Sequence, residues 1–252
     1  MLLDKLIRDE KIINRSLYSS GPYWDYKNSR TILEIKKKGL GDFRGSSAGI
    51  GTSFADNIPS DIRNEFNIKG RIIGKIFSLP ILNKVFNGQL NLTQNYINDF
   101  IKNQAIVYQN NKNVENLINK YHFKNTTEFG CIQIFEKLGI KYSTAYLQMA
   151  DRIEKLSKSF NLENINSFFE IGGGFGANIH FLITNFPNIK KILYLDVVPN
   201  IYVGTEYLRH HYKEKVKDYL ELRNLDKINF SKNNELEIFC IPPWLIEKLE
   251  TE

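Results

Sequence analysis

A glycine-rich turn, E-I-G-G-G-F-G at residues 170–176, constrains the fold of this chain more than any other feature. The apolar run SFFEI at residues 167–171 predicts a buried strand before it, and the apolar spacing of residues 177–186 predicts a helix after it. Glycines permit positive φ angles and a close approach of a ligand to the backbone, and the amide groups that begin the helix then face that ligand. The segment predicts either a cofactor site, as G-x-G-x-x-G does in dinucleotide-binding folds, or only a tight strand-to-helix turn.

Strands and helices alternate through the rest of the C-terminal region. KILYLDVV at residues 191–198 predicts a second strand, residues 205–212 a helix, and LEIFCI at residues 236–241 a third strand that stops at two prolines. Alternation at this spacing is typical of a parallel, doubly wound sheet. We therefore expect residues 161–252 to form an α/β domain.

Residues 1–160 have a different texture, in which helical patterns are separated by polar loops. Apolar residues at i, i+3 and i+4 spacing predict five helices, one at the N-terminus and four over about residues 96–105, 114–121, 127–139 and 144–156. Ser143 or Thr144 would cap the last of these. We expect residues 1–160 to form a mainly helical region that covers the substrate side of the α/β domain.

Two acidic residues narrow the choice of ligand for the glycine turn. Glu170 ends the first strand, where its carboxylate would repel a pyrophosphate and hold a cationic group. Asp196 ends the second strand, where an acid accepts hydrogen bonds from ribose hydroxyls. A ribose joined to a positively charged, phosphate-free group describes S-adenosylmethionine, a sulfonium with an amino-acid tail. Binding of NAD and a turn without a ligand are the alternatives.

Several segments resemble one known family. FFEIGGGFG at 168–176, YLDVVPNIYVGTEYL at 194–208, IPPWLIEKL at 241–249 and GDFRGSSAGIGTSFADN at 41–57 are similar to the sugar O-methyltransferases of bacterial surface-polysaccharide gene clusters. The resemblance extends from about residue 30 to the end of the chain. It implies a Rossmann-like class I methyltransferase sheet behind a helical N-terminal region. It also implies S-adenosylmethionine-dependent methylation of a sugar or sugar-nucleotide hydroxyl during surface-polysaccharide biosynthesis.

The resemblance assigns residues at the carboxyl ends of the strands to the cofactor. The glycines would line its methionine part, Glu170 would lie beside its amino group, and Asp196 would hold the ribose. Val197 would flank the adenine, with Ile241, Pro242 or Trp244 on its other side, although Trp244 is equally well explained as a core aromatic. The cofactor-binding set is then Glu170, Gly172, Gly173, Gly174, Asp196, Val197 and Pro242.

Catalytic and substrate-binding residues are less clearly marked. A general base would help a sugar hydroxyl to react, and histidine is the natural candidate. None of the four histidines (His122, His180, His210 and His211) stands out, so the catalytic base is left unassigned. Arg44, within the glycine-rich segment 39–51, is a candidate to bind a substrate phosphate or carboxylate, or else an exposed arginine of a surface loop.

Net charge and cysteine content exclude other classes of protein. The 252-residue chain has a formal net charge of +6, but its lysine clusters are short and interrupted by acids, so we expect no nucleic-acid-binding face. Cys131 and Cys240 are too few and too distant for a zinc ligand set or a disulfide framework, which excludes a metal finger and favours a reducing compartment. No metal ligand is assigned. The charged N-terminus does not fit a signal peptide, and no apolar stretch approaches the ~20 residues of a membrane span. We expect a cytoplasmic protein with a small-molecule partner.

The length of the sheet region is the last constraint. Members of the resembled family continue past PPW with further strands, whereas this sequence stops soon after the third expected strand. The sequence therefore predicts the first three strands of the sheet only, with weak cofactor binding and little activity unless a second chain completes it. The alternatives are a non-catalytic fragment that acts as a binding or assembly partner, and an NAD-binding Rossmann oxidoreductase.

Overall fold

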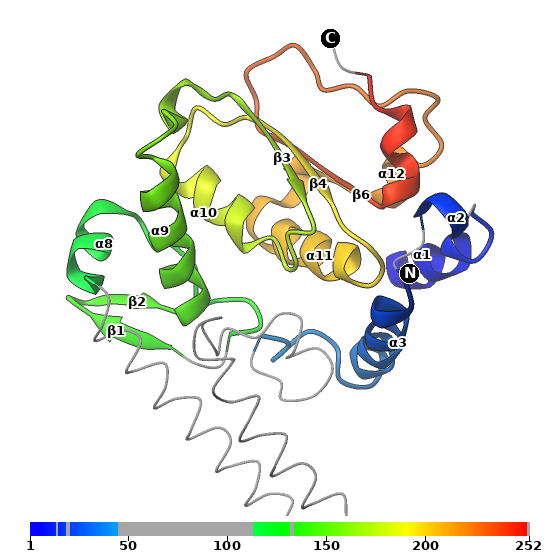
Figure 1. Ribbon diagram of the computed structural model, residues 1–252, viewed down its shortest axis with the longest axis horizontal. Helices are drawn as coiled ribbons and strands as arrows, with labels where there is room; N and C mark the ends of the chain where they lie inside the picture. The colour runs from blue at the N-terminus through cyan, green and yellow to red at the C-terminus, as the bar shows by residue number, and fades with distance from the viewer. Residues whose placement is uncertain (14, 19–20, 45–112, 132–133, 251–252) are drawn as a thin grey trace, which may run out of the picture.

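The computed structural model describes residues 1–13, 15–18, 21–44, 113–131 and 134–250 (Figure 1). At its centre is a four-stranded sheet of β3 (Ser167–Ile171), β4 (Lys191–Leu195), β5 (Val216–Lys217) and β6 (Glu237–Ile241). The strand order is β3-β4-β6-β5, and every pairing is parallel. This confirms the expected α/β class with a parallel sheet. The sequence predicted three strands, and the structure has a fourth, β5. With only two residues, β5 is too short to show the alternating pattern of a strand.

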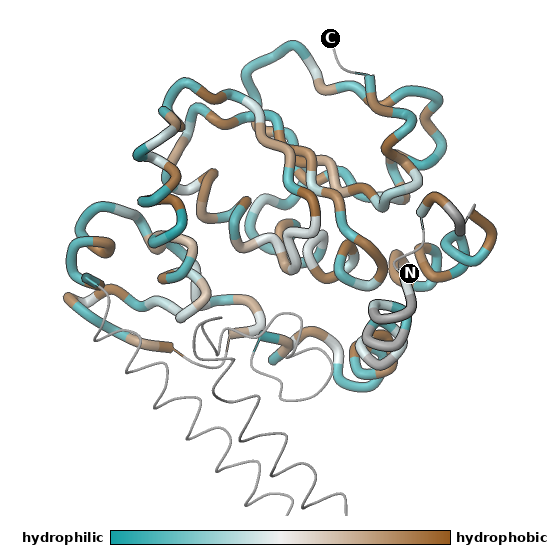
Figure 2. Tube along the Cα trace, in the orientation of Figure 1, coloured by the Kyte–Doolittle hydropathy of each residue, from teal (hydrophilic) through white to brown (hydrophobic). Residues whose placement is uncertain are grey.

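Two helices cover one face of the sheet. α10 (Ala177–Asn185) connects β3 to β4, and α11 (Asn200–Tyr212) leads from β4 towards β5 (Figure 1). Tyr194 of β4 packs so closely on α11 that a Cβ added at Gly204 would lie 2.4 Å from its hydroxyl oxygen. The buried apolar residues of the strands and of these helices belong to one hydrophobic core. Figure 2 shows the hydrophobic stretches of the strands at its centre.

The other face of the sheet is covered unevenly. Phe230 stacks on Phe239 of β6 with ring centroids 4.2 Å apart. At the opposite edge, the side chains of Phe169 and Ile171 in β3 are 46% and 69% exposed. The expectation of a buried strand over residues 167–171 is therefore wrong for this face, because β3 is an edge strand among the described residues.

The C-terminal part is completed by short elements. The 3-10 turns are η1 (Leu162–Asn164) before β3, η2 (Lys213–Lys215) after α11 and η3 (Pro243–Lys248) after β6. A short helix, α12 (Tyr219–Leu222), follows β5 and is capped by Asp218 in a capping box.

The N-terminal region contributes α1 (Leu2–Glu10), α2 (Arg15–Tyr18), α3 (Gly21–Lys38), α8 (Val114–Lys120) and α9 (Thr144–Leu156). The predicted helices at the N-terminus, over 114–121 and over 144–156 are confirmed, whereas the one over 96–105 lies outside the described residues. In Figure 1, α9 lies beside α10, and α1 lies at the other end of the helical layer against α11 and α12. Asp9 of α1 is buried there and accepts hydrogen bonds from Tyr219 and Arg223.

The predicted helix over residues 127–139 is wrong. In its place, β1 (Phe135–Lys137) and β2 (Ile140–Tyr142) form an antiparallel hairpin. Leu138 and Gly139 join the strands with φ angles of 54° and 75°. Two consecutive residues with positive φ make the type of turn whose twist matches that of a hairpin, and they cannot continue a right-handed helix. Among the described residues, no helix is long and apolar enough to cross a membrane.

Candidate functional site

The glycine turn after β3 requires glycine for two different reasons. Gly172, Gly174 and Gly176 have φ angles of 71°, 65° and 85°, which other residues rarely adopt. Gly173 is needed for space, since a Cβ there would lie 2.4 Å from the carboxyl carbon of Glu170. The turn therefore wraps closely around the Glu170 side chain and presents its backbone beyond the end of the strand.

Glu170 is a buried acid with one unsatisfied oxygen. Its side chain points from β3 towards α10, where the Asn178 amide donates a hydrogen bond of 2.5 Å to Oε1. The residue is 7% exposed, and Oε2 has no hydrogen-bond partner among the described residues. Burial, with a smaller contribution from the charge of Asp196, raises the pKa of Glu170 to about 6. A buried polar atom without a partner costs free energy, so this oxygen is suited to receive a cationic donor.

Asp196 links the end of β4 to the glycine turn. Its Oδ2 accepts a hydrogen bond of 2.9 Å from the amide of Gly174, and its Oδ1 accepts one of 2.7 Å from the amide of Val197. The residue is 4% exposed, and burial raises the pKa of its carboxyl group to about 6 in spite of these hydrogen bonds. The hydroxyl of Tyr194 donates a hydrogen bond of 2.5 Å to the carbonyl oxygen of Gly174. The sequence pattern did not indicate this structural role, in which Asp196 and Tyr194 hold the turn.

The residues assigned to the cofactor follow neighbouring strands at one edge of the sheet. Ile171, Leu195 and Ile241 are aligned in the parallel register, so the glycine turn, Asp196 and Pro242 all begin at the same level. This brings Glu170, Gly172, Gly173, Gly174, Asp196, Val197 and Pro242 to the carboxyl ends of β3, β4 and β6. Ligands of open α/β sheets bind outside this edge.

Trp244 lies in a different setting. Its ring packs edge-on against Tyr219 with centroids 5.8 Å apart, and its Nε1 donates a hydrogen bond of 3.3 Å to the Tyr219 hydroxyl. That hydroxyl in turn donates to Asp9 of α1. These contacts favour the core interpretation of Trp244 over its assignment to the adenine.

Arg44 is fully buried, which corrects its interpretation as an exposed arginine of a surface loop. Its Nη1 donates to the carbonyl oxygens of Thr126 and Phe129 at 2.8 and 3.4 Å, and its Nη2 donates to Ser143 Oγ at 2.8 Å. The guanidinium carbon lies 4.9 Å from the centroid of the Phe175 ring in the glycine turn. Since these donors are directed at protein acceptors, Arg44 clamps the residues around 126–129 and the start of α9 beneath the turn.

His180 is also committed to internal contacts. Its Nε2 lies 3.0 Å from the carbonyl oxygen of Lys124, and its Nδ1 lies 2.8 Å from the Tyr212 hydroxyl. A carbonyl oxygen only accepts, so Nε2 carries the proton in the neutral ring and Nδ1 accepts from the tyrosine. Burial lowers the pKa of His180 to about 4. With both nitrogens engaged, His180 has no lone pair directed at a substrate.

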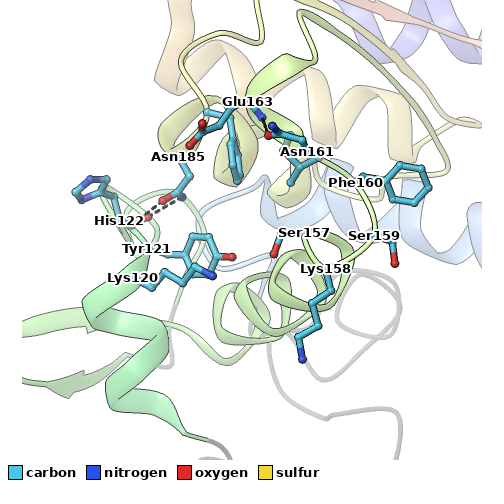
Figure 3. Close-up of a pocket in the computed structure, with 12 residues that line it drawn as sticks. Lys120, Tyr121, His122, Ser157, Lys158, Ser159, Phe160, Asn161, Glu163 and Asn185 are labelled. Atoms are coloured by element: carbon cyan, nitrogen blue, oxygen red, sulfur yellow. Dashed lines mark hydrogen bonds between the residues drawn. The ribbon is translucent and has the colours of Figure 1, made fainter.

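A cavity of about 570 Å³ lies away from the glycine turn (Figure 3). It is bounded by the ends of α8, α9 and α10 and by η1, which precedes β3, so it opens at the amino end of that strand. Figure 3 shows Asn185 bridging to the backbone of His122 at its rim, through hydrogen bonds of 2.7 and 3.1 Å. None of the residues assigned to the cofactor or the substrate lines this cavity.

Comparison with known proteins found no matching family model, no similar curated protein and no similar solved structure. A function for this chain therefore rests on the geometry of the site and on the pattern of its sequence.

Proposed function

We propose that the carboxyl edge of this sheet binds S-adenosylmethionine and that the protein is an O-methyltransferase acting on a sugar or sugar-nucleotide hydroxyl. The observation that carries the proposal is the buried Glu170 carboxylate, whose Oε2 has no partner among the described residues and lies against a glycine turn. A carboxylate in this position favours a positively charged group such as the amino group of a methionine moiety. The acceptor class rests on the resemblance of the sequence alone.

Asp196 supports the ribose part of the proposal. An ionised carboxylate has about four lone-pair positions. On Asp196, Oδ1 accepts hydrogen bonds from the Val197 amide and the Asn200 side chain, and Oδ2 accepts one from the Gly174 amide. The Tyr194 hydroxyl is 3.4 Å from Oδ2 but donates its proton to the Gly174 carbonyl oxygen, so one position on Oδ2 remains for a ribose hydroxyl donor. The hydrogen bonds from Gly174 and Val197 fix the orientation of the carboxylate before any ligand arrives. The residues present therefore fit the cofactor.

The contribution of the chain to transfer would be alignment. When bound, S-adenosylmethionine supplies a methyl group on a sulfonium, which a hydroxyl oxygen displaces in line. Glu170 would hold the amino-acid tail and Asp196 the ribose, and fixing both ends orients the group between them. Alignment of two reactants accounts for a large part of the acceleration in such reactions.

Binding measurements separate this proposal from NAD binding. Isothermal titration with S-adenosylhomocysteine should give saturable binding that Glu170→Gln weakens by at least about tenfold, since a charged hydrogen bond contributes about 1.5–3 kcal/mol. Glu163→Gln makes the same chemical change at an exposed position in η1 and should leave the affinity unchanged. Binding of NAD without any response to S-adenosylhomocysteine would overturn the proposal.

A non-catalytic role in assembly is the second candidate function. The observation in its favour is the edge position of β3 among the described residues, with Phe169 and Ile171 exposed beside it. Edge strands with apolar neighbours readily pair with another chain. A protein that binds neither S-adenosylhomocysteine nor NAD and sediments as a concentration-dependent oligomer would favour this role.

A further inference from the structure

Three potential metal ligands meet on the outer side of the helical layer. Glu128 lies in the segment before the β1–β2 hairpin, whereas His210 and His211 lie in the last turn of α11. One ligand atom from each residue lies within 4.8 Å of the other two. The sequence indicated no metal ligands, and more than 80 residues separate Glu128 from the histidine pair.

The separation between Glu128 and His210 suits a shared ion. Glu128 Oε2 and His210 Nε2 are 3.6 Å apart, which is too far for a hydrogen bond. Two ligands of one tetrahedral zinc ion, each about 2.0–2.2 Å from it, are about 3.4 Å apart. The pair therefore stands close to the spacing that coordination requires.

His211 provides an independent observation. Its Nε2 is buried and has no hydrogen-bond partner among the described residues. Buried ring nitrogens are ordinarily paired, and an exception needs a physical explanation. Coordination of a metal ion satisfies such a nitrogen without a proton.

The two imidazole rings are held in place by aromatic neighbours. His210 stacks on Phe129 with ring centroids 5.0 Å apart, and His211 stacks on His180 at 4.1 Å. The Phe129 carbonyl oxygen accepts a hydrogen bond from the buried Arg44, which anchors the segment that carries Glu128. Fixed orientation of this kind is what supporting residues supply around metal ligands.

We propose that Glu128, His210 and His211 bind a divalent transition-metal ion of the zinc class. Two imidazoles and one carboxylate suit zinc and its neighbours, whereas calcium and magnesium prefer oxygen ligands alone. The positive charge of Arg44 acts against a cation here, and the carboxylate of Glu128 offsets it. Because Glu128 and His210 are exposed, water completes the coordination shell.

Titration of the metal-free protein with Zn²⁺ tests the site. We expect one ion per chain, and we expect Co²⁺ to give the visible absorption of a four- or five-coordinate centre. Glu128→Gln and His210→Ala should each weaken Zn²⁺ binding by about tenfold or more, because a three-ligand site then retains two protein ligands. His122→Ala, a change at an exposed histidine outside the cluster, should leave the affinity unchanged.

The two ligand variants guard against loss of folding as an explanation. Both altered side chains are exposed. In a chelator, Glu128→Gln should melt at the temperature of the unaltered protein, and His210→Ala should melt slightly lower because it loses the stacking on Phe129. If the melting temperature shows that one variant is destabilised, the Zn²⁺ affinity of the other variant decides the outcome. Absence of stoichiometric Zn²⁺ binding, or equal affinity in a folded Glu128→Gln or His210→Ala variant, would overturn the proposal. This result does not depend on whether the protein binds S-adenosylhomocysteine, so the metal site and the proposed function are tested separately.

Discussion

Glu170→Gln should change how the stability of the protein depends on pH. Burial raises the pKa of Glu170 from 4.5 to about 6, so the folded state holds this proton more tightly than the unfolded state does. The stabilisation is complete below about pH 4.5 and is lost as the pH rises through about 6. Glutamine is uncharged at every pH in this range, so the variant does not lose stability in this way as the pH rises.

The size of the effect is set by the difference in pKa. A rise of about 1.5 in pKa, at about 1.4 kcal/mol for each unit, costs the native protein about 2 kcal/mol between about pH 4 and about pH 7.5. The amide of glutamine has its own cost when it replaces Oε2. That cost does not depend on pH, so it cancels when the change in stability is compared at the two pH values.

Urea denaturation at the two pH values measures this difference. The stability of Glu170→Gln relative to the unaltered protein should improve by about 2 kcal/mol from the acidic to the neutral condition. Glu163→Gln is the matched control, because its side chain is exposed, and its relative stability should change little. A difference near zero for Glu170→Gln, or one of opposite sign, would refute the description of Glu170 as a buried acid.

Two further changes test the packing beneath and within the turn. Gly173→Ala should destabilise the protein by about 1–3 kcal/mol and weaken S-adenosylhomocysteine binding, because the alanine Cβ would lie 2.4 Å from the Glu170 carboxyl carbon. Urea denaturation measures the stability and calorimetry the affinity. Unchanged values in both would contradict the close packing of Gly173 on Glu170. Arg44→Met should lower the free energy of unfolding, measured by urea denaturation, by about 3 kcal/mol, because it removes charged hydrogen bonds to buried acceptors. A loss under about 0.5 kcal/mol would contradict the role of Arg44 as a clamp.

The sequence predicted the elements that have strong local signals. β3, β4 and β6 are apolar runs that end in glycine, aspartate or proline, and α8, α9, α10 and α11 follow from apolar periodicity. The β1–β2 hairpin was missed because apolar residues at 135 and 138 fit a helical spacing as well. The deciding feature, positive φ at Leu138, is unusual for a leucine and leaves no mark in the residue pattern.

The candidate site was predictable where it lies at the ends of strands and not where it depends on distant partners. Parallel register alone brings Asp196 and the glycine turn to one edge. In contrast, the burial of Arg44 depends on acceptors 82 to 99 residues away in the chain. The meeting of Glu128 with His210 depends in the same way on how α11 packs. No local pattern in the sequence encodes such contacts.

The most direct test of the proposed function is calorimetric titration of the protein and of Glu170→Gln with S-adenosylhomocysteine and NAD. The proposal predicts that S-adenosylhomocysteine binds, that NAD does not, and that the affinity for S-adenosylhomocysteine falls by at least about tenfold in the variant. Equal binding by the two proteins, or binding of NAD alone, would contradict the assignment of the glycine turn and Glu170 to this cofactor.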